Sequence, residues 1–150
     1  MVLKEGMKAP TFEGIDQNGN VIKLKDYTGK KVVLYFYPKD DTPTCTVQAC
    51  NLRDNYKELL KENYLVLGVS PDTSKSHKKF AKKFSLPFPL IADPDKKIIN
   101  EYKVWGEKTL FGRDYMGVLR TTFVIDGKGR IERIISKVES SDHTRQIFKT

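Results

Sequence analysis

The two cysteines of the chain, Cys45 and Cys50, lie five positions apart in the segment YFYPKDDTPTCTVQAC, residues 35–50. They are the only thiols among 150 residues. An ionised thiol is a nucleophile, and it can be oxidised and then joined to a second thiol. The pair therefore either performs redox chemistry or serves only as packing.

The residues before Cys45 predict that it lies in the first turn of a helix. Pro38 ends an apolar run, Thr42 is a suitable N-cap, and Pro43 suits the first helical position. The free amides and the positive end of the helix dipole favour a thiolate there. A single cysteine in this position is more often a small packing residue. The capped first turn and the second thiol close by favour a nucleophile instead.

The spacing to Cys50 indicates how the two thiols can react. Five residues of helix give ~7.5 Å of rise and ~500° of rotation, which places the two Cα atoms ~8–9 Å apart. A disulfide needs Cα atoms within ~7 Å, so the helix must unwind locally before the thiols can join. Two thiols without paired histidines make an incomplete zinc site. The segment also lacks the C-x-x-C spacing of a dithiol redox motif.

The elements that must position these residues alternate between strands and helices. Apolar runs predict buried strands at residues 31–37 and 64–70, a short strand within 86–94, and a hairpin of 121–126 with 130–135. Helical patterns cover residues 43–63, 73–84, 96–102 and 140–150, and we expect the last of these to pack weakly. This order predicts an α/β fold with a central mixed sheet flanked by helices. The face of the 43–63 helix that we expect to be buried carries Val47, Leu52, Tyr56, Leu59 and Leu60.

Length and composition limit the class of protein. We expect residues 1–150 to form one domain, which is large enough for a hydrophobic core. No apolar run approaches the ~20 residues of a membrane helix, and the first residues lack a signal-peptide core. We therefore expect a cytoplasmic protein with no membrane partner, where paired cysteines are more often reactive than structural.

The net charge of +8 is concentrated on the helix predicted at residues 73–84. Five of its lysines share one face: Lys75, Lys78, Lys79, Lys82 and Lys83. A solvated face is the interpretation we favour. An acidic reductase surface or a nucleic acid stays open as a partner, although the absence of interleaved aromatic residues argues against nucleic acid.

The segment from Pro38 to Cys45 resembles the peroxiredoxin signature, Pro-x-x-x-Thr-x-x-Cys. The residues that follow, through Cys50, resemble the Q-type subfamily, also called bacterioferritin comigratory proteins. Further matches at residues 8–12, 67–72, 86–90, 104–108 and 120–123 extend the resemblance over nearly the whole chain. It implies a thioredoxin-like fold and the reduction of hydrogen peroxide and alkyl hydroperoxides, with no metal and no bound cofactor.

On this resemblance, Cys45 is the peroxidatic thiol and Cys50 the resolving thiol. Thr42 would hydrogen-bond the thiolate and the peroxide, Arg120 would hold the thiolate and the developing charge, and Pro38 would shield the pocket from water. The sulfenic acid of Cys45 would condense with Cys50 to an intramolecular disulfide, which thioredoxin or a similar dithiol would reduce. The implied enzyme is an atypical 2-Cys peroxidase. We expect a monomer, with a weak dimer as the alternative.

Two other functions stay open from the sequence. One is a protein dithiol–disulfide oxidoreductase, and the other is a basic nucleic-acid-binding module that happens to contain thiols. Several residues have plain structural interpretations. We expect Gln48 to occupy an ordinary helix position, with a role in organising the pocket entrance as the alternative. We expect His77 and His143 to be structural or exposed, and Trp105 to be a packing anchor.

Overall fold

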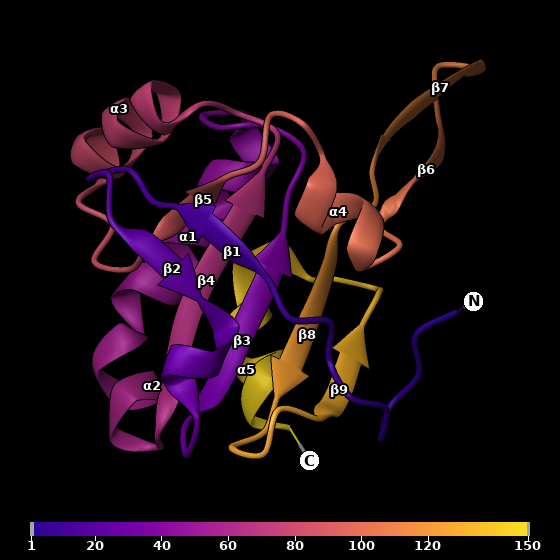
Figure 1. Cartoon of the computed structure of the whole chain (residues 1–150). Coiled ribbons are helices and arrows are strands. Elements are labelled where there is room, and N and C mark those ends of the chain that lie inside the picture. Colours follow the sequence, from indigo (N-terminus) through magenta and orange to yellow (C-terminus); the bar gives the residue numbers. More distant parts are fainter. Residues whose placement is uncertain (1, 150) are drawn as a thin grey trace.

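Figure 1 shows the computed structural model, which describes residues 2–149. Within these residues, seven strands form one mixed sheet in the order β2-β1-β5-β4-β3-β8-β9. Their bounds are Glu13–Ile15 (β1), Val21–Lys23 (β2), Lys31–Phe36 (β3), Tyr64–Ser70 (β4), Leu90–Ala92 (β5), Thr121–Ile125 (β8) and Ile131–Ile135 (β9). The predicted central mixed sheet is confirmed, with each predicted strand in its place.

Strand β3 lies at the middle of the sheet and leads directly to the cysteine segment. It pairs in parallel with β4 and antiparallel with β8. Its side chains alternate between two cores, with Leu34 and Phe36 on one face and Val33 and Tyr35 on the other. Because both faces are covered, the strand needs the continuous apolar run that makes it recognisable in the sequence.

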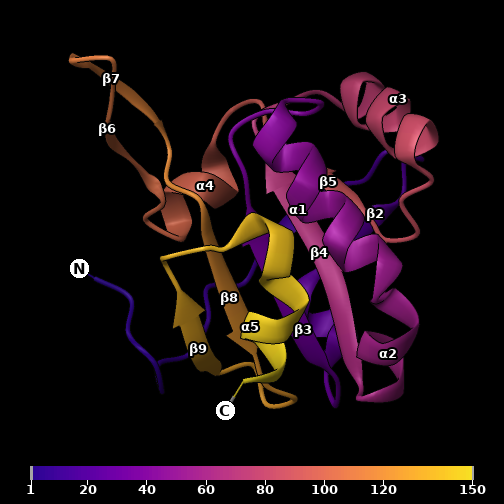
Figure 2. The same cartoon turned by 180° about the vertical axis from the view of Figure 1, so that it is seen from behind.

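Helices cover both faces of the sheet. In the described part of the chain, the α-helices are Pro43–Asp54 (α1), Tyr56–Lys61 (α2), Ser74–Phe84 (α3), Lys97–Glu101 (α4) and His143–Phe148 (α5), and the 3-10 helices are Leu24–Tyr27 (η1) and Ser140–Asp142 (η2). Figure 2 shows α1, α2 and α5 in front of the sheet, whereas α4 lies on the opposite face. Cys45 belongs to the core beneath α1 and α5.

The prediction of a single helix over residues 43–63 is wrong in one respect. The segment forms two helices, α1 and α2, which are separated at Asn55. The side-chain amide of Asn55 donates to the carbonyl of Asn51 at 2.8 Å, a local bond that competes with the helical ladder. The predicted buried face is also only partly correct. Leu52 is fully buried, but the side chains of Val47 and Leu60 are 46% and 45% exposed.

A hairpin of β6 (Trp105–Leu110) and β7 (Arg113–Val118) is missing from the elements that the sequence predicts. It stands out from the body of the molecule in Figures 1 and 2. Most of its residues are exposed, and Gly106 and Gly117 face each other across its base, so its strand signal in the sequence is weak. Its second strand leads to Arg120, two residues beyond the end of β7.

The C-terminal segment packs more firmly than we expect from the sequence. Ile147 is 1% exposed, and Arg133 of β9 donates to the carbonyls of Gln146 and Ile147 at 2.8 and 2.9 Å. The expectation of weak packing is therefore wrong for residues 140–149, while Thr150 lies outside the described residues. A helix of six residues is not stable alone, so these tertiary contacts hold it.

His143 at the start of α5 is buried in a neutral hydrogen-bonded state. Its Nδ1 lies 2.8 Å from Oε1 of Gln146, and its Nε2 lies 2.8 Å from the hydroxyl of Thr122. Because the Gln146 oxygen can only accept, Nδ1 donates and Nε2 accepts from the hydroxyl. Burial lowers the pKa of His143 below its ordinary 6.5, the bond to Gln146 opposes this, and Arg120 and Arg133 lower it further. The expectation of a structural role is confirmed.

This depressed pKa predicts that the fold loses stability in mild acid. The unfolded chain binds a proton at His143 near pH 6.5, whereas the folded chain resists it, so the free energy of unfolding falls as the pH drops below about 6.5. If folding lowers the pKa of His143 by one unit, the free energy of unfolding falls by up to about 1.4 kcal/mol in acid. Urea unfolding between pH 5 and 8 measures this, as the difference between wild type and His143→Gln. Equal pH slopes in the two proteins would contradict the assignment.

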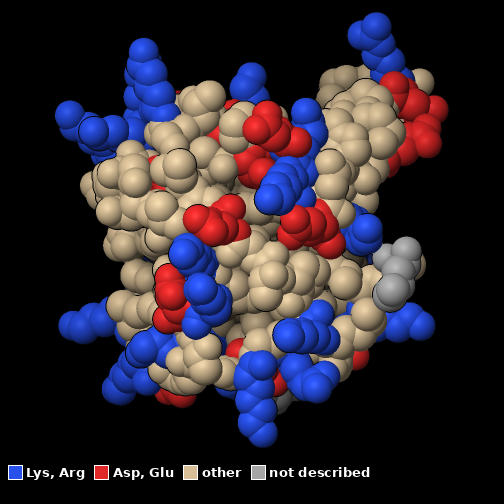
Figure 3. All heavy atoms as spheres, viewed as in Figure 1, with Lys and Arg blue, Asp and Glu red and all other residues tan. Residues whose placement is uncertain are grey.

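The surface bears the basic face that the sequence predicts. All five lysines of α3 are exposed, and Lys83 pairs with Asp41 at 2.8 Å. Figure 3 shows lysine and arginine side chains projecting from the region of α3. Among residues 2–149, no helix is long and apolar enough to cross a membrane.

Candidate active site

The thiol of Cys45 is held in the first turn of α1, as the sequence predicts. Thr42 occupies the N-cap position with extended backbone, Pro43 opens the helix, and the side chain of Cys45 is 1% exposed. The hydroxyl of Thr42 does not cap the helix, however. It donates instead to the carbonyl of Lys39 at 3.3 Å. The N-cap position is thus confirmed, and the expected capping bond is wrong.

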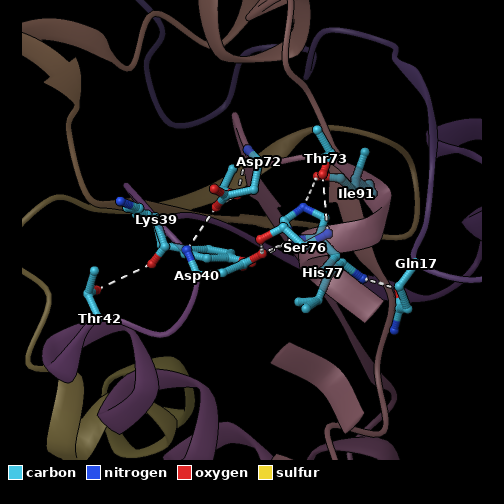
Figure 4. A network of polar contacts seen from close by, with 12 residues as sticks. Gln17, Lys39, Asp40, Thr42, Asp72, Thr73, Ser76, His77 and Ile91 are labelled. Atoms are coloured by element: carbon cyan, nitrogen blue, oxygen red, sulfur yellow. Dashed lines mark hydrogen bonds and ion pairs between the residues drawn. The ribbon is translucent and has the colours of Figure 1, made fainter. Parts of the chain in front are cut away.

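A buried polar network fixes the loop between β3 and α1, and Figure 4 shows it from close by. The carboxylate of Asp40 accepts from the hydroxyls of Tyr37 and Ser76 at 2.6 and 2.7 Å. The amide of Asp40 donates to Asp72 at 2.8 Å. The loop that carries Thr42 is therefore tied to the end of β4 and to the start of α3.

His77 completes this network. Its Nε2 lies 3.0 Å from the carbonyl of Ile91, which can only accept, so Nε2 carries a proton. Its Nδ1 lies 2.7 Å from Asp40. Asp40, Asp72 and His77 lie close enough to suggest a metal site, but both ring nitrogens are already used. The cluster is best explained as a hydrogen-bonded support for the loop.

Arg120 reaches Cys45 from the start of β8. Its Nη2 donates to Sγ of Cys45 at 3.2 Å, and its Nη1 donates to Oε1 of Gln48 at 2.6 Å. Gln48 is fully buried one turn after Cys45, so it orients the guanidinium toward the thiol. The expectation that Gln48 is an ordinary helix position is therefore wrong. The sequence feature that indicates this role of Gln48 is its i, i+3 spacing from Cys45, which places both side chains on one helix face.

Lys108 and Tyr35 are two further neighbours of the thiol that the sequence does not reveal. Burial lowers the pKa of Lys108, Arg120 lowers it further, and Cys45 opposes the shift. Burial raises the pKa of Tyr35 well above its usual 10.0, with Cys45 adding to the effect, so the phenol stays neutral. Among the described residues, the hydroxyl of Tyr35 has no hydrogen-bond partner. The surroundings of the thiol thus include Arg120, Lys108 and a neutral phenol.

Cys50 lies in the same unbroken helix as Cys45, and both thiols are free. Cys50 is half-buried, whereas Cys45 is buried. The expected reduced arrangement, with both thiols helical and unbonded, is confirmed. Pro38 is half-buried at the end of the strand, in the loop that precedes α1.

A buried helix-start thiol contacted by an arginine, at the end of the central strand of a mixed α/β sheet, defines a thiol-dependent redox protein. The model of the AhpC/TSA family matches residues 6–134. The chain belongs to this family.

Curated relatives and solved structures agree with this assignment. Peroxiredoxin Bcp of Bacillus subtilis is 43% identical over 150 residues, covering 100% of this chain and 96% of the relative. Peroxiredoxin Bcp of Escherichia coli K12 is 45% identical over 141 residues, covering 94% and 90%. A Cys→Ser mutant of Xylella fastidiosa PrxQ superposes with a TM-score of 0.91 at 30% identity, covering 98% of this chain and 94% of that one.

The bacterioferritin comigratory protein of Xanthomonas campestris, whose alkyl peroxide reduction activity was studied with trapped intermediates and ligands, is similar too. It superposes with a TM-score of 0.88 at 30% identity, covering 96% of this chain and 94% of that one. The thioredoxin-like fold of the peroxiredoxins and the resemblance to the Q-type subfamily are confirmed.

Proposed function

We propose that this chain is a thiol peroxidase that reduces hydrogen peroxide and alkyl hydroperoxides through Cys45. The observation that carries the proposal is the contact of the Arg120 guanidinium with Sγ of Cys45 at 3.2 Å, at the start of a helix. Both features place hydrogen-bond donors and positive charge beside the sulfur that acts as the nucleophile. The relative from Xanthomonas campestris, with its alkyl peroxide reduction activity, supports the same substrate class.

The first step is an in-line displacement on the peroxide. The thiolate of Cys45 attacks one oxygen of ROOH, the O–O bond breaks, and RO⁻ leaves and takes up a proton. The products are the sulfenic acid of Cys45 and ROH, or water from hydrogen peroxide. Arg120 stabilises the charge that moves to the leaving oxygen, and Gln48 keeps the guanidinium in place. When the peroxide binds, the Thr42 hydroxyl, which donates to the carbonyl of Lys39 in this structure, turns to the peroxide, and Pro38 shields the pocket from water.

The second step uses Cys50 as the resolving thiol. The sulfenic acid of Cys45 and the thiol of Cys50 condense to a disulfide with loss of water, and a dithiol such as thioredoxin reduces it. Because α1 is unbroken from Pro43 to Asp54, residues 44–51 must unwind before the two sulfur atoms can meet. The partners are thus a hydroperoxide and a dithiol reductant. We propose that residues 1–150 act as one peroxiredoxin domain and that the protein acts as a monomer, with a weak dimer as the alternative.

A coupled assay tests this function against the dithiol oxidoreductase alternative. Reduced protein is mixed with hydrogen peroxide or an alkyl hydroperoxide, thioredoxin, thioredoxin reductase and NADPH. We expect NADPH oxidation that depends on both peroxide and protein. In a separate assay with dithiothreitol in place of thioredoxin, we expect this protein not to accelerate the reduction of insulin disulfides. Insulin reduction without peroxide turnover would favour the alternative.

Arg120→Met should lower the rate of the first step by on the order of a hundredfold or more, because the charge-bearing donors are lost while much of the apolar stem remains. The measurement is the second-order rate of peroxide reaction under single-turnover conditions. Arg113→Met on the exposed hairpin is the matched control and should keep the wild-type rate. A rate for Arg120→Met within a factor of about two of wild type would mean that the transition state is stabilised elsewhere.

A further inference from the structure

Asn51 follows Cys50 directly in α1, and its side chain is bonded entirely to the C-terminal segment. Its Oδ1 accepts from the amide and the hydroxyl of Thr144, each at 2.8 Å. Its Nδ2 donates to the carbonyl of Ser141 at 3.0 Å. One side chain beside the second thiol therefore joins α1 to both η2 and α5.

These bonds also complete the start of α5. Asp142 is the N-cap residue of α5, but its side chain makes no capping bond. The amide of Thr144, in the first turn, is satisfied by Asn51 from another helix. The C-terminal helix is thus capped by a residue of the segment that must unwind in the second step.

The first two turns of α1 border open space beside the C-terminal segment. An open groove of about 370 Å³ runs beside them. It is lined by Pro43, Thr44, Val47, Val138, Ser140 and Ser141. Val47 is 46% exposed there. On this side α1 therefore borders open space at Thr44 and Val47, whereas the segment at Cys50 is held through Asn51.

We propose that Asn51 is a positioning residue that latches the Cys50 segment of α1 to residues 140–149 and slows disulfide formation until it opens. The inference rests on the proposed function of Cys50. Disulfide formation joins Sγ of Cys45 to Sγ of Cys50. The sulfenic oxygen leaves as water, together with its own hydrogen and the hydrogen of the Cys50 thiol. Unwinding residues 44–51 breaks the bonds of Asn51, so oxidation also frees the start of α5.

The latch sets a competition between two fates of the sulfenic acid. While α1 stays closed, a second peroxide can oxidise Cys45 to the sulfinic acid. Once α1 opens, Cys50 captures the sulfenic acid instead. A tighter latch thus favours overoxidation, and a looser latch favours the disulfide.

Asn51→Ala tests the latch. We expect disulfide formation to accelerate about tenfold, which is the effect of losing about one net hydrogen bond. The rate of the first peroxide reaction should stay within about twofold of wild type, because Asn51 does not contact the thiol of Cys45. Rapid mixing with one equivalent of peroxide, acid quench and mass spectrometry separate the two steps. At excess peroxide, the yield of sulfinic acid should fall by a similar factor.

Two matched variants separate the latch from general loosening of the C-terminal segment. Arg133→Met removes two bonds between β9 and α5 without touching α1, so it should lower thermal stability but leave the disulfide rate within about twofold of wild type. Thr144→Val keeps the shape and the amide but removes the hydroxyl bonded to Asn51. It should accelerate disulfide formation less than Asn51→Ala, and the double variant should add little.

Hydrogen exchange gives an independent readout. In the wild-type disulfide form, amides of residues 140–149 should exchange faster than in the reduced form. Equal exchange in the two forms, an unchanged disulfide rate in Asn51→Ala, or equal acceleration by Arg133→Met would each overturn the latch while leaving the role of Cys50 intact. Failure of the wild type to form the disulfide at all would instead overturn the role of Cys50, and the latch with it.

Discussion

Cys45→Ser should abolish peroxide reduction without unfolding the protein. The substitution exchanges one atom, and the serine hydroxyl can still accept a hydrogen bond from Arg120, so the buried site keeps its shape. A serine hydroxyl is a far weaker nucleophile than a thiolate and needs a general base, which neither histidine supplies. His77 and His143, the two histidines of the chain, are both committed to other hydrogen bonds.

The measurement is peroxide consumption by reduced protein, with and without thioredoxin, together with the intact mass after peroxide treatment. The variant should gain no oxygen at position 45 and should consume no peroxide above background. Circular dichroism and thermal unfolding serve as the control for folding. Peroxide turnover retained in a folded Cys45→Ser protein would remove Cys45 from the role of nucleophile.

The local part of the site could be predicted from the sequence because its signals are short-range. The apolar run of β3, the proline that ends it and the Thr-Pro pair at the start of α1 lie within a few residues of each other. They place Cys45 in a helix's first turn without reference to any other part of the chain. The distance between two thiols five residues apart in a helix follows from helix geometry alone.

The contact of Arg120 with Cys45 could not be derived in this way. It joins residues 75 positions apart, and it depends on the antiparallel register of β8 beside β3. In the sequence, Arg120 is one of several arginines, and only the family resemblance distinguishes it from the others. The position of Gln48 beside Cys45 is predictable from the sequence, because the two residues share a helix face. The helix pattern alone favours ordinary packing for Gln48, because the sequence does not place its partner Arg120.

The contacts of the C-terminal segment illustrate the same limit. A six-residue helix gives a weak signal, and its stability comes from Arg133, from Asn51 and from the burial of Ile147. Each of these is a tertiary contact. The hairpin of β6 and β7 is not predictable for a related reason, because exposed strands without a strict apolar alternation have the sequence pattern of loops.

Cys50→Ser should separate the two halves of the reaction. Cys45, Arg120 and Gln48 are intact in this variant, so it should still consume about one equivalent of peroxide at a rate close to wild type. It should then stop, because no second thiol is present to form the disulfide that thioredoxin reduces. The sulfenic acid of Cys45 should persist, react with a dimedone probe and become prone to further oxidation. NADPH-linked turnover with thioredoxin should be lost.

The same variant decides why the two thiols are five residues apart. In wild type, the disulfide should hold residues 44–51 in a non-helical form, so oxidation should lower helix content and raise amide exchange there. Cys50→Ser lacks the disulfide, and its helix should stay closed after oxidation. A disulfide-bonded protein with an intact helix from Cys45 to Cys50 would contradict this account. Wild-type turnover in Cys50→Ser would also contradict it, because resolution would then come from an external thiol and the spacing would need another explanation.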